Sequence, residues 1–421
     1  MVPIIFTSIY DDEYGGDLNG DATSTVPAPG DWYGVWISGN SNDSVFDYTV
    51  FRYGGAGNYE KANLYVENTS VNISNSVFEY SKVYGLSLTN SDSQVSGNVF
   101  RYNNTAGELS ASGLRIFNSS STSSPTIQNN TFQENRTGIA LQGGTPNISQ
   151  NTFTSNLSYP IKAQSSFGTF SENSGSGNGI DAILLQSAIT KTNGTTTLRA
   201  NFLPYMFSGE LRIMASSTLV VEPEVVVKSS GGILRVYGNL NLNGQNPEDI
   251  VFTSINDDSV GGDTNNDGIC RPDNASSTAQ CPSPGDWSGI SLLPEAEMRA
   301  MGFAVKYAGG TGARGASEAG LTIQESKVNL ENALFDTNTK YGVKIINATT
   351  TIKNSEFRNH TQPGNAAALA YYNSPINLEN VTFSGNNLAI YADSKSIVHT
   401  ATDLMFLNNA ATTSPEDLLN P

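Results

Sequence analysis

The chain has 421 residues, of which 22 are Lys or Arg and 39 are Asp or Glu, so its formal net charge is −17. No basic stripe follows the sequence, which argues against nucleic acid as a partner. No apolar run approaches the length of a membrane span, so we expect none in this segment. Asn, Ser, Thr and Gly are abundant, but Val, Ile, Leu and Phe recur at fixed positions, which favours a packed β structure over disorder.

An acidic segment near the start of the chain occurs again near its middle. The first copy reads FTSIYDDEYGGDLNGD and is followed by PAPGDW, and the second reads FTSINDDSVGGDTNNDG and is followed by PSPGDW. The acidic positions match at a constant offset of 246 and the GDW segments at 255, so the second copy carries nine extra residues. A long identity pattern at constant offset indicates a duplication.

The duplication predicts two tandem homologous arrays. Residues 1–185 form the first, residues 186–248 a transition with a strand-rich lead-in, and residues 249–421 the second. The first array lacks the lead-in that Leu203 to Gly244 provide for the second. We interpret the chain as an excerpt of a longer secreted protein that enters in the middle of a repeat; a native start at Met1 with a lost lead-in is the alternative. Residues 1–20 do not resemble a signal peptide.

Most of the sequence follows one rule, an aliphatic residue five positions before a phenylalanine. The pairs are Ile73/Phe78, Val95/Phe100, Ile127/Phe132, Ile148/Phe153, Leu330/Phe335, Ile352/Phe357 and Leu378/Phe383. Successive phenylalanines lie about one coil apart, with 22 residues from Phe78 to Phe100, 21 from Phe132 to Phe153 and 22 from Phe335 to Phe357, whereas Ser-rich inserts lengthen gaps such as Phe100 to Phe132. Within each unit the apolar residues alternate with period two, which predicts short strands with one buried face. Such strands bury enough surface only when identical units stack.

Asparagine recurs at two fixed distances from these phenylalanines. The residues are Asn75, Asn129, Asn332, Asn354 and Asn380 three positions before, and Asn103, Asn135, Asn156, Asn338 and Asn386 three positions after. Asparagine tolerates left-handed backbone conformations, so both columns fit corners between strands, where stacked amides can bond along the axis. The pattern predicts an all-β chain folded as a parallel β-helix.

Both acidic segments have the pattern of a calcium site. In the second, Asp263, Asn265 and Asp267 precede a glycine in the D-x-N-x-D-G form, and Asp257 and Asp258 lie just upstream. Alternate oxygen side chains of this kind converge on one calcium ion, and the glycine allows a sharp turn. A solvated acidic turn without an ion is the alternative.

The first segment supplies the matching candidates. These are Asp11, Asp12, Asp17, Asn19 and Asp21. Here Ala22 replaces the glycine and Gly20 moves the flexible position one place earlier. We expect calcium in both loops. The aspartates of the GDW segments, Asp31 and Asp286, are expected to cap a turn before a strand.

The nine extra residues of the second copy lie in the region that holds both cysteines, Cys270 and Cys281. Two cysteines eleven residues apart in an otherwise cysteine-free, secreted-looking chain predict a local disulfide, with two isolated thiols as the alternative. Sequons are frequent, including Asn135, Asn156 and Asn274. Some are expected to carry glycans if the source has that machinery.

The chain resembles the right-handed parallel β-helix proteins of the pectin lyase-like superfamily. Its lead-in, SGELRIMASSTLVVEPEVVVKSSGGILRVYGNLNLNGQNPEDIVFTS, resembles the opening module of large bacterial and archaeal surface β-helix proteins, which typically continue with an Asp/Gly-rich loop and a GDW segment. The resemblance implies the fold for nearly the whole chain. It implies little about activity, because this fold hosts lyases, hydrolases, adhesins and tailspikes.

We expect no enzyme activity. The chain has no hydrolase-like GHG or RIK segment, and its few basic residues form no cluster in the sequence. The Asp pairs 11/12 and 257/258 imitate catalytic carboxylates, but their duplication inside the calcium loops fits a structural role better.

We therefore predict an extracellular structural or adhesive segment of a larger cell-surface protein (a surface layer, a stalk or an adhesin), stabilised by calcium. Its expected partners are neighbouring copies or other surface proteins, and possible ligands are glycans. The alternative is a carbohydrate-binding or carbohydrate-cleaving β-helix. For that alternative, exposed tyrosines offer sugar-stacking faces, unless they merely stack on one another; they are Tyr48, Tyr53, Tyr59, Tyr65, Tyr80 and Tyr84.

Overall fold

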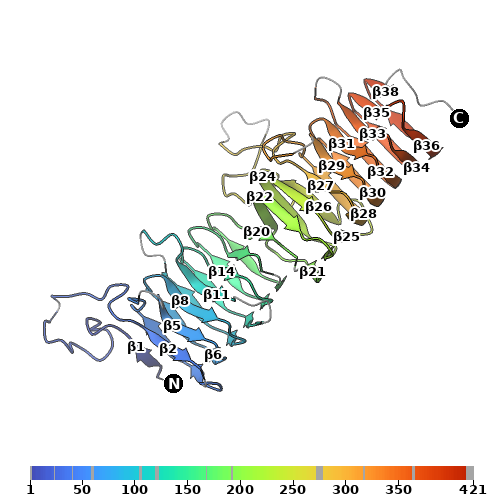
Figure 1. Ribbon diagram of the computed structural model, residues 1–421. Coiled ribbons are helices and arrows are strands. Elements are labelled where there is room, and N and C mark those ends of the chain that lie inside the picture. Colours follow the sequence, from blue (N-terminus) through green and yellow to red (C-terminus); the bar gives the residue numbers. More distant parts are fainter. Residues whose placement is uncertain are drawn as a thin grey trace. The chain divides into compact units, whose positions relative to one another are not determined.

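The computed structural model describes residues 2–22, 24–39, 41–57, 61–103, 107–118, 123–166, 168–190, 193–271, 278–315, 318–362 and 366–413. Over these residues the secondary structure consists of β-strands, turns and bends, with no helix (Figure 1). Consequently none of these residues belongs to a helix that could cross a membrane. The chain divides into two compact units, Met1–Leu184 with Asn201–Leu203, and Leu185–Ala200 with Pro204–Pro421.

The first unit is a stack of parallel strands in three sheets. The first sheet holds β1 (Ile4–Phe6), β4 (Thr49–Arg52), β7 (Val77–Glu79), β10 (Val99–Arg101), β13 (Thr131–Gln133), β16 (Thr152–Thr154) and β19 (Ser174–Ser176) in that order. The second holds β3 (Val45–Asp47), β6 (Asn72–Ser74), β9 (Gln94–Ser96), β12 (Thr126–Gln128), β15 (Asn147–Ser149) and β18 (Thr169–Ser171). The third holds β2 (Val35–Ser38), β5 (Ala62–Glu67), β8 (Tyr84–Thr89), β11 (Ser112–Phe117), β14 (Ile139–Gln142) and β17 (Ile161–Gln164).

The second unit also stacks parallel strands, several of them ten residues long. Between the units in sequence lies β20 (Ile183–Ala188). The strands that follow are β21 (Thr195–Leu198), β22 (Tyr205–Ile213), β23 (Thr218–Val221), β24 (Val226–Val236), β25 (Asn239–Asn243), β26 (Ile250–Ser254), β27 (Ile290–Leu292), β28 (Glu297–Lys306), β29 (Ala319–Gln324), β30 (Lys327–Asp336), β31 (Tyr341–Ile346), β32 (Thr349–Arg358), β33 (Ala367–Tyr372), β34 (Pro375–Ser384), β35 (Leu388–Ala392), β36 (Ile397–Thr402), β37 (Met405–Leu407) and β38 (Ala411–Thr413).

The phenylalanines form buried columns along each stack. From Phe51 through Phe78, Phe100 and Phe132 to Phe153, successive ring centroids are 5.1, 4.9, 4.7 and 4.9 Å apart. The register pairs each phenylalanine with the one in the neighbouring coil, and the aliphatic residues five positions earlier pair in the same way. The predicted coil register and the parallel β-helix are therefore confirmed.

The two asparagine columns have different roles. Those three positions before the phenylalanine, such as Asn75 and Asn129, have φ values of 49° and 56° and make the left-handed corners that we predicted. Those three positions after it are buried and form a ladder. In that ladder the Asn103 Nδ2 donates to Asn135 Oδ1 at 2.9 Å, and Asn135 donates to Asn156 at 3.1 Å. Each amide thus satisfies its neighbour along the stack.

A second asparagine ladder, two positions before the phenylalanines, was not predicted. Asn98 donates to Asn130 at 3.0 Å, Asn130 to Asn151 at 3.0 Å, and Asn151 to Asn173 at 3.1 Å. Every Nδ2 also donates to a backbone carbonyl of the preceding coil, for example from Asn130 to Val95 O at 3.0 Å. These bonds satisfy backbone groups at the corners, where the sheet ladders are interrupted.

Candidate metal centre

The two acidic loops start in the same way. Each follows an FTS segment, which lies at the end of β26 in the second copy and begins at the last residue of β1 in the first, and the threonine hydroxyl donates to the first aspartate. The Thr253 Oγ1 lies 2.7 Å from Asp257 Oδ2, and Thr7 makes the same bond to Asp11. Both aspartates are buried. Their carboxylates therefore fix the loop to the strand before it.

The two GDW segments close the loops in equivalent ways. Asp31 Oδ2 accepts from the Ser8 hydroxyl at 2.6 Å and from the Ala28 backbone N–H at 2.9 Å. Asp286 Oδ2 accepts from Ser254 at 2.5 Å and from the Ser283 backbone at 3.1 Å. The predicted role of these aspartates in a turn is confirmed. The following tryptophan donates its indole N–H to a backbone carbonyl in both copies, at 2.8 Å.

In the second loop, three aspartates each use one oxygen for the backbone. Asp258 Oδ2 accepts from Cys270 N at 2.8 Å, Asp263 Oδ2 from Gly268 N at 3.0 Å, and Asp267 Oδ2 from Gln280 N at 3.0 Å. The other oxygen of each, Oδ1, is buried and has no hydrogen-bond partner. Asn265 Oδ1 is buried without a partner as well. Four acceptor atoms of one loop are thus fixed in place and left without a donor.

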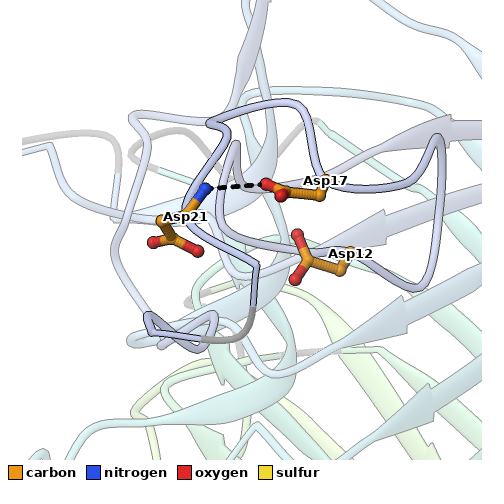
Figure 2. A group of neighbouring side chains, drawn as sticks. All are labelled: Asp12, Asp17 and Asp21. Carbon is orange, nitrogen blue, oxygen red and sulfur yellow. Dashed lines mark hydrogen bonds between the residues drawn. The ribbon is translucent and has the colours of Figure 1, made fainter.

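In the first loop, carboxylate oxygens of Asp12, Asp17 and Asp21 lie within 4.8 Å of one another (Figure 2). Asp17 accepts from the backbone N–H groups of Gly20 at 2.7 Å, Asp21 at 3.1 Å and Ala22 at 2.8 Å. The Oδ1 atoms of Asp12 and Asp21 are buried without a partner, as are those of their counterparts Asp258 and Asp267.

Asn19 contacts one of these three aspartates. Its Nδ2 donates to Asp21 Oδ2 at 3.0 Å. In the part of the chain that the structure describes, Asp12, Asp17 and Asp21 form the one group of three His, Cys, Asp or Glu residues that meets this distance criterion.

Burial and mutual repulsion raise the pKa of one carboxyl in each loop. Partial exclusion of water raises the pKa of Asp12, and the charges of Asp17 and Asp21 raise it further. Burial raises the pKa of Asp258, and Asp263 and Asp267 add to the effect. A cation that neutralises the neighbouring carboxylates would stabilise the ionised form of such a carboxyl.

Each loop also rests on a buried basic side chain. The Lys228 ammonium donates to the backbone carbonyls of Asp257 at 2.9 Å and Gly262 at 2.7 Å. Burial lowers the pKa of Lys228 to about 8, although the aspartates nearby oppose this. Under the first loop, Arg52 contacts Asp11 at 3.5 Å and Glu13 at 2.7 Å. Neither contact was foreseen, because both cations lie in strands far from the loops in sequence.

The predicted disulfide is present. Cys270 and Cys281 are bonded, with their Cα atoms 4.9 Å apart. The Cys270 backbone N–H holds Asp258, so the disulfide borders the second site directly.

Three tyrosines of the first unit stack on one another. The rings of Tyr53 and Tyr80 stack at 5.2 Å, and those of Tyr80 and Tyr102 at 5.1 Å. The alternative interpretation, mutual stacking, therefore holds for Tyr53 and Tyr80. Tyr48 is exposed, and Tyr59 lies outside the described residues.

Two other expectations concern surface chemistry. Asn135 and Asn156 are buried in the ladder, so a glycan there is incompatible with the folded coil, and Asn274 lies outside the described residues. The basic residues form no cluster in the sequence, but the fold brings three of them to one pocket. Arg115, Arg136 and Lys162 line one pocket, although 21 and 26 residues separate them in the chain.

The comparison with protein families gave one match. A model described as right handed beta helix region matches residues 62–202 and, in an overlapping placement, residues 112–241. The comparison with curated proteins gave no match, and neither did the comparison with solved structures. The family match and the parallel coils agree on the fold, and neither specifies an activity.

Proposed function

We propose that this parallel β-helix, which a right handed beta helix family model matches over residues 62–202 and 112–241, is a calcium-stabilised structural or adhesive segment of a larger extracellular protein. The observation that carries the proposal is the set of buried oxygen atoms without partners in both acidic loops. Leaving a buried acceptor unsatisfied costs about 1–3 kcal/mol. A cation that these oxygens share removes that cost at several atoms together.

The chemistry of the donors favours calcium over softer metals. Asp258, Asp263, Asn265 and Asp267 offer only oxygen atoms, which hard cations prefer. Their attachment to backbone N–H groups through the second oxygen holds the first one in place. Asp11 and Asp257 instead accept hydrogen bonds from threonine hydroxyls and anchor their loops. The remaining candidate residues would therefore be the main ligands of the ions.

The disulfide supports an extracellular location, and the proposed calcium sites are consistent with it. A disulfide such as Cys270–Cys281 is typical of an oxidising compartment outside the cytoplasm. Calcium is plentiful outside cells, so even a site with a dissociation constant of about 10⁻⁴ M stays occupied there and need not act as a switch.

A structural role fits the way in which the coils are held together. Phenylalanine columns and amide ladders repeat from coil to coil, so each coil stabilises the next. Strands in such a stack advance by about 4.8 Å per coil, so the number of coils sets the length of the segment along the stack. Neighbouring copies or other surface proteins are the partners that such a segment would hold apart or bind.

Thermal melting and limited proteolysis with and without a calcium chelator test the proposal. Chelation is expected to lower the melting temperature and to increase cleavage within residues 11–21 and 257–267. Combining Asp263→Ala with Asp267→Ala should reproduce the cleavage in the second loop only.

A matched control removes two carboxylates elsewhere in the same unit. Glu297 and Glu331 are exposed on β28 and β30, so Glu297→Ala with Glu331→Ala makes the same change in net charge without touching a loop. This control should keep the chelator response of the unaltered chain. If the unaltered chain has the same melting temperature and the same cleavage in excess chelator as in calcium, both segments are ordinary acidic turns without an ion.

Carbohydrate binding is the second candidate. Trp36 is 56% exposed on the third sheet of the first unit, and its ring centroid is 6.3 Å from that of Tyr65. Exposed aromatic faces of this kind stack on sugars. A glycan array together with an activity screen on uronate polymers separates this candidate from the first. Binding that Trp36→Ala abolishes, or any cleavage, would favour the second candidate.

A further inference from the structure

A pocket of about 240 Å³ lies on the third sheet of the first unit, away from both acidic loops. Arg115, Ala140 and Lys162 line it and are paired in register across three successive strands. Ser87 and Tyr65 continue the same column on the two preceding strands, outside the pocket. The strands β8, β11 and β14 that carry the middle part of the column lie side by side in Figure 1.

Three cationic side chains of different coils line this pocket. Arg115 and Lys162 are two coils apart in the column, roughly 10 Å at the usual strand spacing. The small Ala140 lies between them and leaves space. Arg136 comes from the turn before β14, where its Nε donates to Leu109 O at 3.2 Å.

The guanidinium of Arg115 is held in place on one side. It lies over the rings of Tyr84 and Phe117, 5.3 and 4.7 Å from their centroids, and donates to Ser87 Oγ at 3.2 Å. Its remaining N–H groups are available to a ligand, since an arginine offers five. Packing that fixes a donor before binding reduces the ordering that a ligand has to impose.

The three cations lack acidic partners in the part of the chain that the structure describes. Within the described residues no carboxylate forms an ion pair with Arg115, Arg136 or Lys162, although the chain has 39 acidic residues. The pocket lining contains no Asp, Glu or His; its other polar groups include Gln142, Gln164 and Thr137. Three positive charges thus converge on a small, uncharged polar space in a protein whose net charge is −17.

We propose that this pocket binds a phosphate monoester. Arginine and lysine together suit an anion that accepts several hydrogen bonds at once. A carboxylate would bring one negative charge, whereas a phosphate monoester brings between −1.5 and −2 at neutral pH and three acceptor oxygens. The phosphate can be carried by a soluble ester or by a lipid headgroup, and the pocket chemistry is the same for both.

Calorimetric titration with glycerol 3-phosphate tests the proposal, with glycerol and galacturonate as matched ligands that lack the phosphate. Glycerol 3-phosphate should bind saturably and the other two should not. Affinity should rise between about pH 5 and pH 7.5, because the second pKa of a phosphate monoester is about 6. The described lining holds no carboxyl or imidazole group, the side chains that ordinarily titrate in that range.

Lys162→Gln removes one exposed cation of the pocket and should weaken binding about tenfold, the typical effect of losing one charge-assisted hydrogen bond. Lys395→Gln makes the same charge change at an exposed lysine of the other unit and should leave the affinity unchanged. Sedimentation with phosphatidylcholine vesicles, with and without phosphatidic acid, tells a lipid source from a soluble one.

Three results would overturn the proposal. They are the absence of saturable binding of glycerol 3-phosphate, equal binding of galacturonate, and equal weakening by Lys162→Gln and Lys395→Gln. The calcium proposal does not depend on this pocket, because no residue of the two acidic loops lines it.

Discussion

A single histidine interrupts the asparagine ladder of the second unit, at His360. It is fully buried, its Nδ1 lies 2.9 Å from Asn386 Oδ1, and its Nε2 lies 3.3 Å from Asn338 Nδ2. Because an amide oxygen accepts and an amide nitrogen donates, Nδ1 carries the proton and the ring is neutral. The histidine therefore reproduces the donor and acceptor pattern of an asparagine.

This ladder position predicts an acid-sensitive coil. Burial lowers the pKa of His360 from 6.5 to about 4. Between these two pH values the unfolded chain binds a proton that the folded chain excludes, so the stability of the neutral ring is present above pH 6.5 and is lost as the pH falls towards 4. The full loss amounts to roughly 3 kcal/mol at 1.36 kcal/mol per pKa unit.

His360→Asn provides the comparison, because asparagine occupies the equivalent position in neighbouring coils. Chemical denaturation at pH 7 and pH 4.5 should show a smaller loss of stability in the variant than in the unaltered chain. Equal losses would mean that the ring is not the group that takes up the proton.

The phenylalanine columns give a second prediction at this scale. Phe357 is fully buried between Phe335 and Phe383, with ring centroids 5.1 and 5.2 Å away. Phe357→Ala should destabilise its surroundings by roughly 3–5 kcal/mol, because the neighbouring rings keep their places and leave a cavity. Hydrogen exchange should locate the loss in the adjacent coils, since stacked repeats contact only their neighbours.

Phe202→Ala is the matched control, because Phe202 is 78% exposed. It should change neither stability nor exchange. A uniform loss of protection over the whole second unit in Phe357→Ala would contradict the local coupling proposed here.

At the scale of elements, the second acidic loop depends on its disulfide. Cys270 donates its backbone N–H to Asp258, and the bond to Cys281 fixes where that N–H points. Closing a loop of this size stabilises by roughly 3 kcal/mol in the chain-entropy model. Mass spectrometry without reduction should show a peptide pair two hydrogens lighter than two thiols.

Reduction should then weaken calcium binding in the second loop and leave the first unchanged, because the first copy has no cysteine. Terbium luminescence, recorded before and after reduction, measures this in the unaltered chain and in Asp263→Ala with Asp267→Ala. Full labelling of both cysteines in the native, unreduced protein would contradict the bond itself.

The coils could be predicted because their spacing is local. Ile127 and Phe132 lie in one coil, and their counterparts Ile148 and Phe153 repeat the spacing in the next, so the register follows from the sequence. The left-handed corner at Asn129 follows from the same count. The two acidic loops could be aligned because their acidic residues match at a constant offset of 246.

The contacts that could not be predicted join distant segments. Lys228 bonds the carbonyl of Gly262, which lies 34 residues later in the chain, and Arg136 and Lys162 come to line one pocket only because the coils stack. The ladder of Asn98 and Asn130 has the same 32-residue spacing as that of Asn103 and Asn135. Its position two residues before the phenylalanine could therefore have been found in the sequence as well.

At the scale of the whole molecule, the two halves of the duplicated sequence each carry an acidic loop at an equivalent place. The equivalence extends to individual atoms. Thr7 and Thr253 bond the first aspartate, Ser8 and Ser254 the aspartate of the GDW segment, and Asp12 and Asp258 each present one buried oxygen without a partner. A duplication that keeps such oxygens in both copies is best explained by a ligand that both copies bind.

Calorimetric titration of the chelator-treated chain with calcium tests this most directly. The account predicts two ions bound per chain, one per loop, and one ion in the variant that combines Asp263→Ala with Asp267→Ala. The absence of saturable calcium binding to the unaltered chain, or an unchanged stoichiometry in the variant, would contradict it.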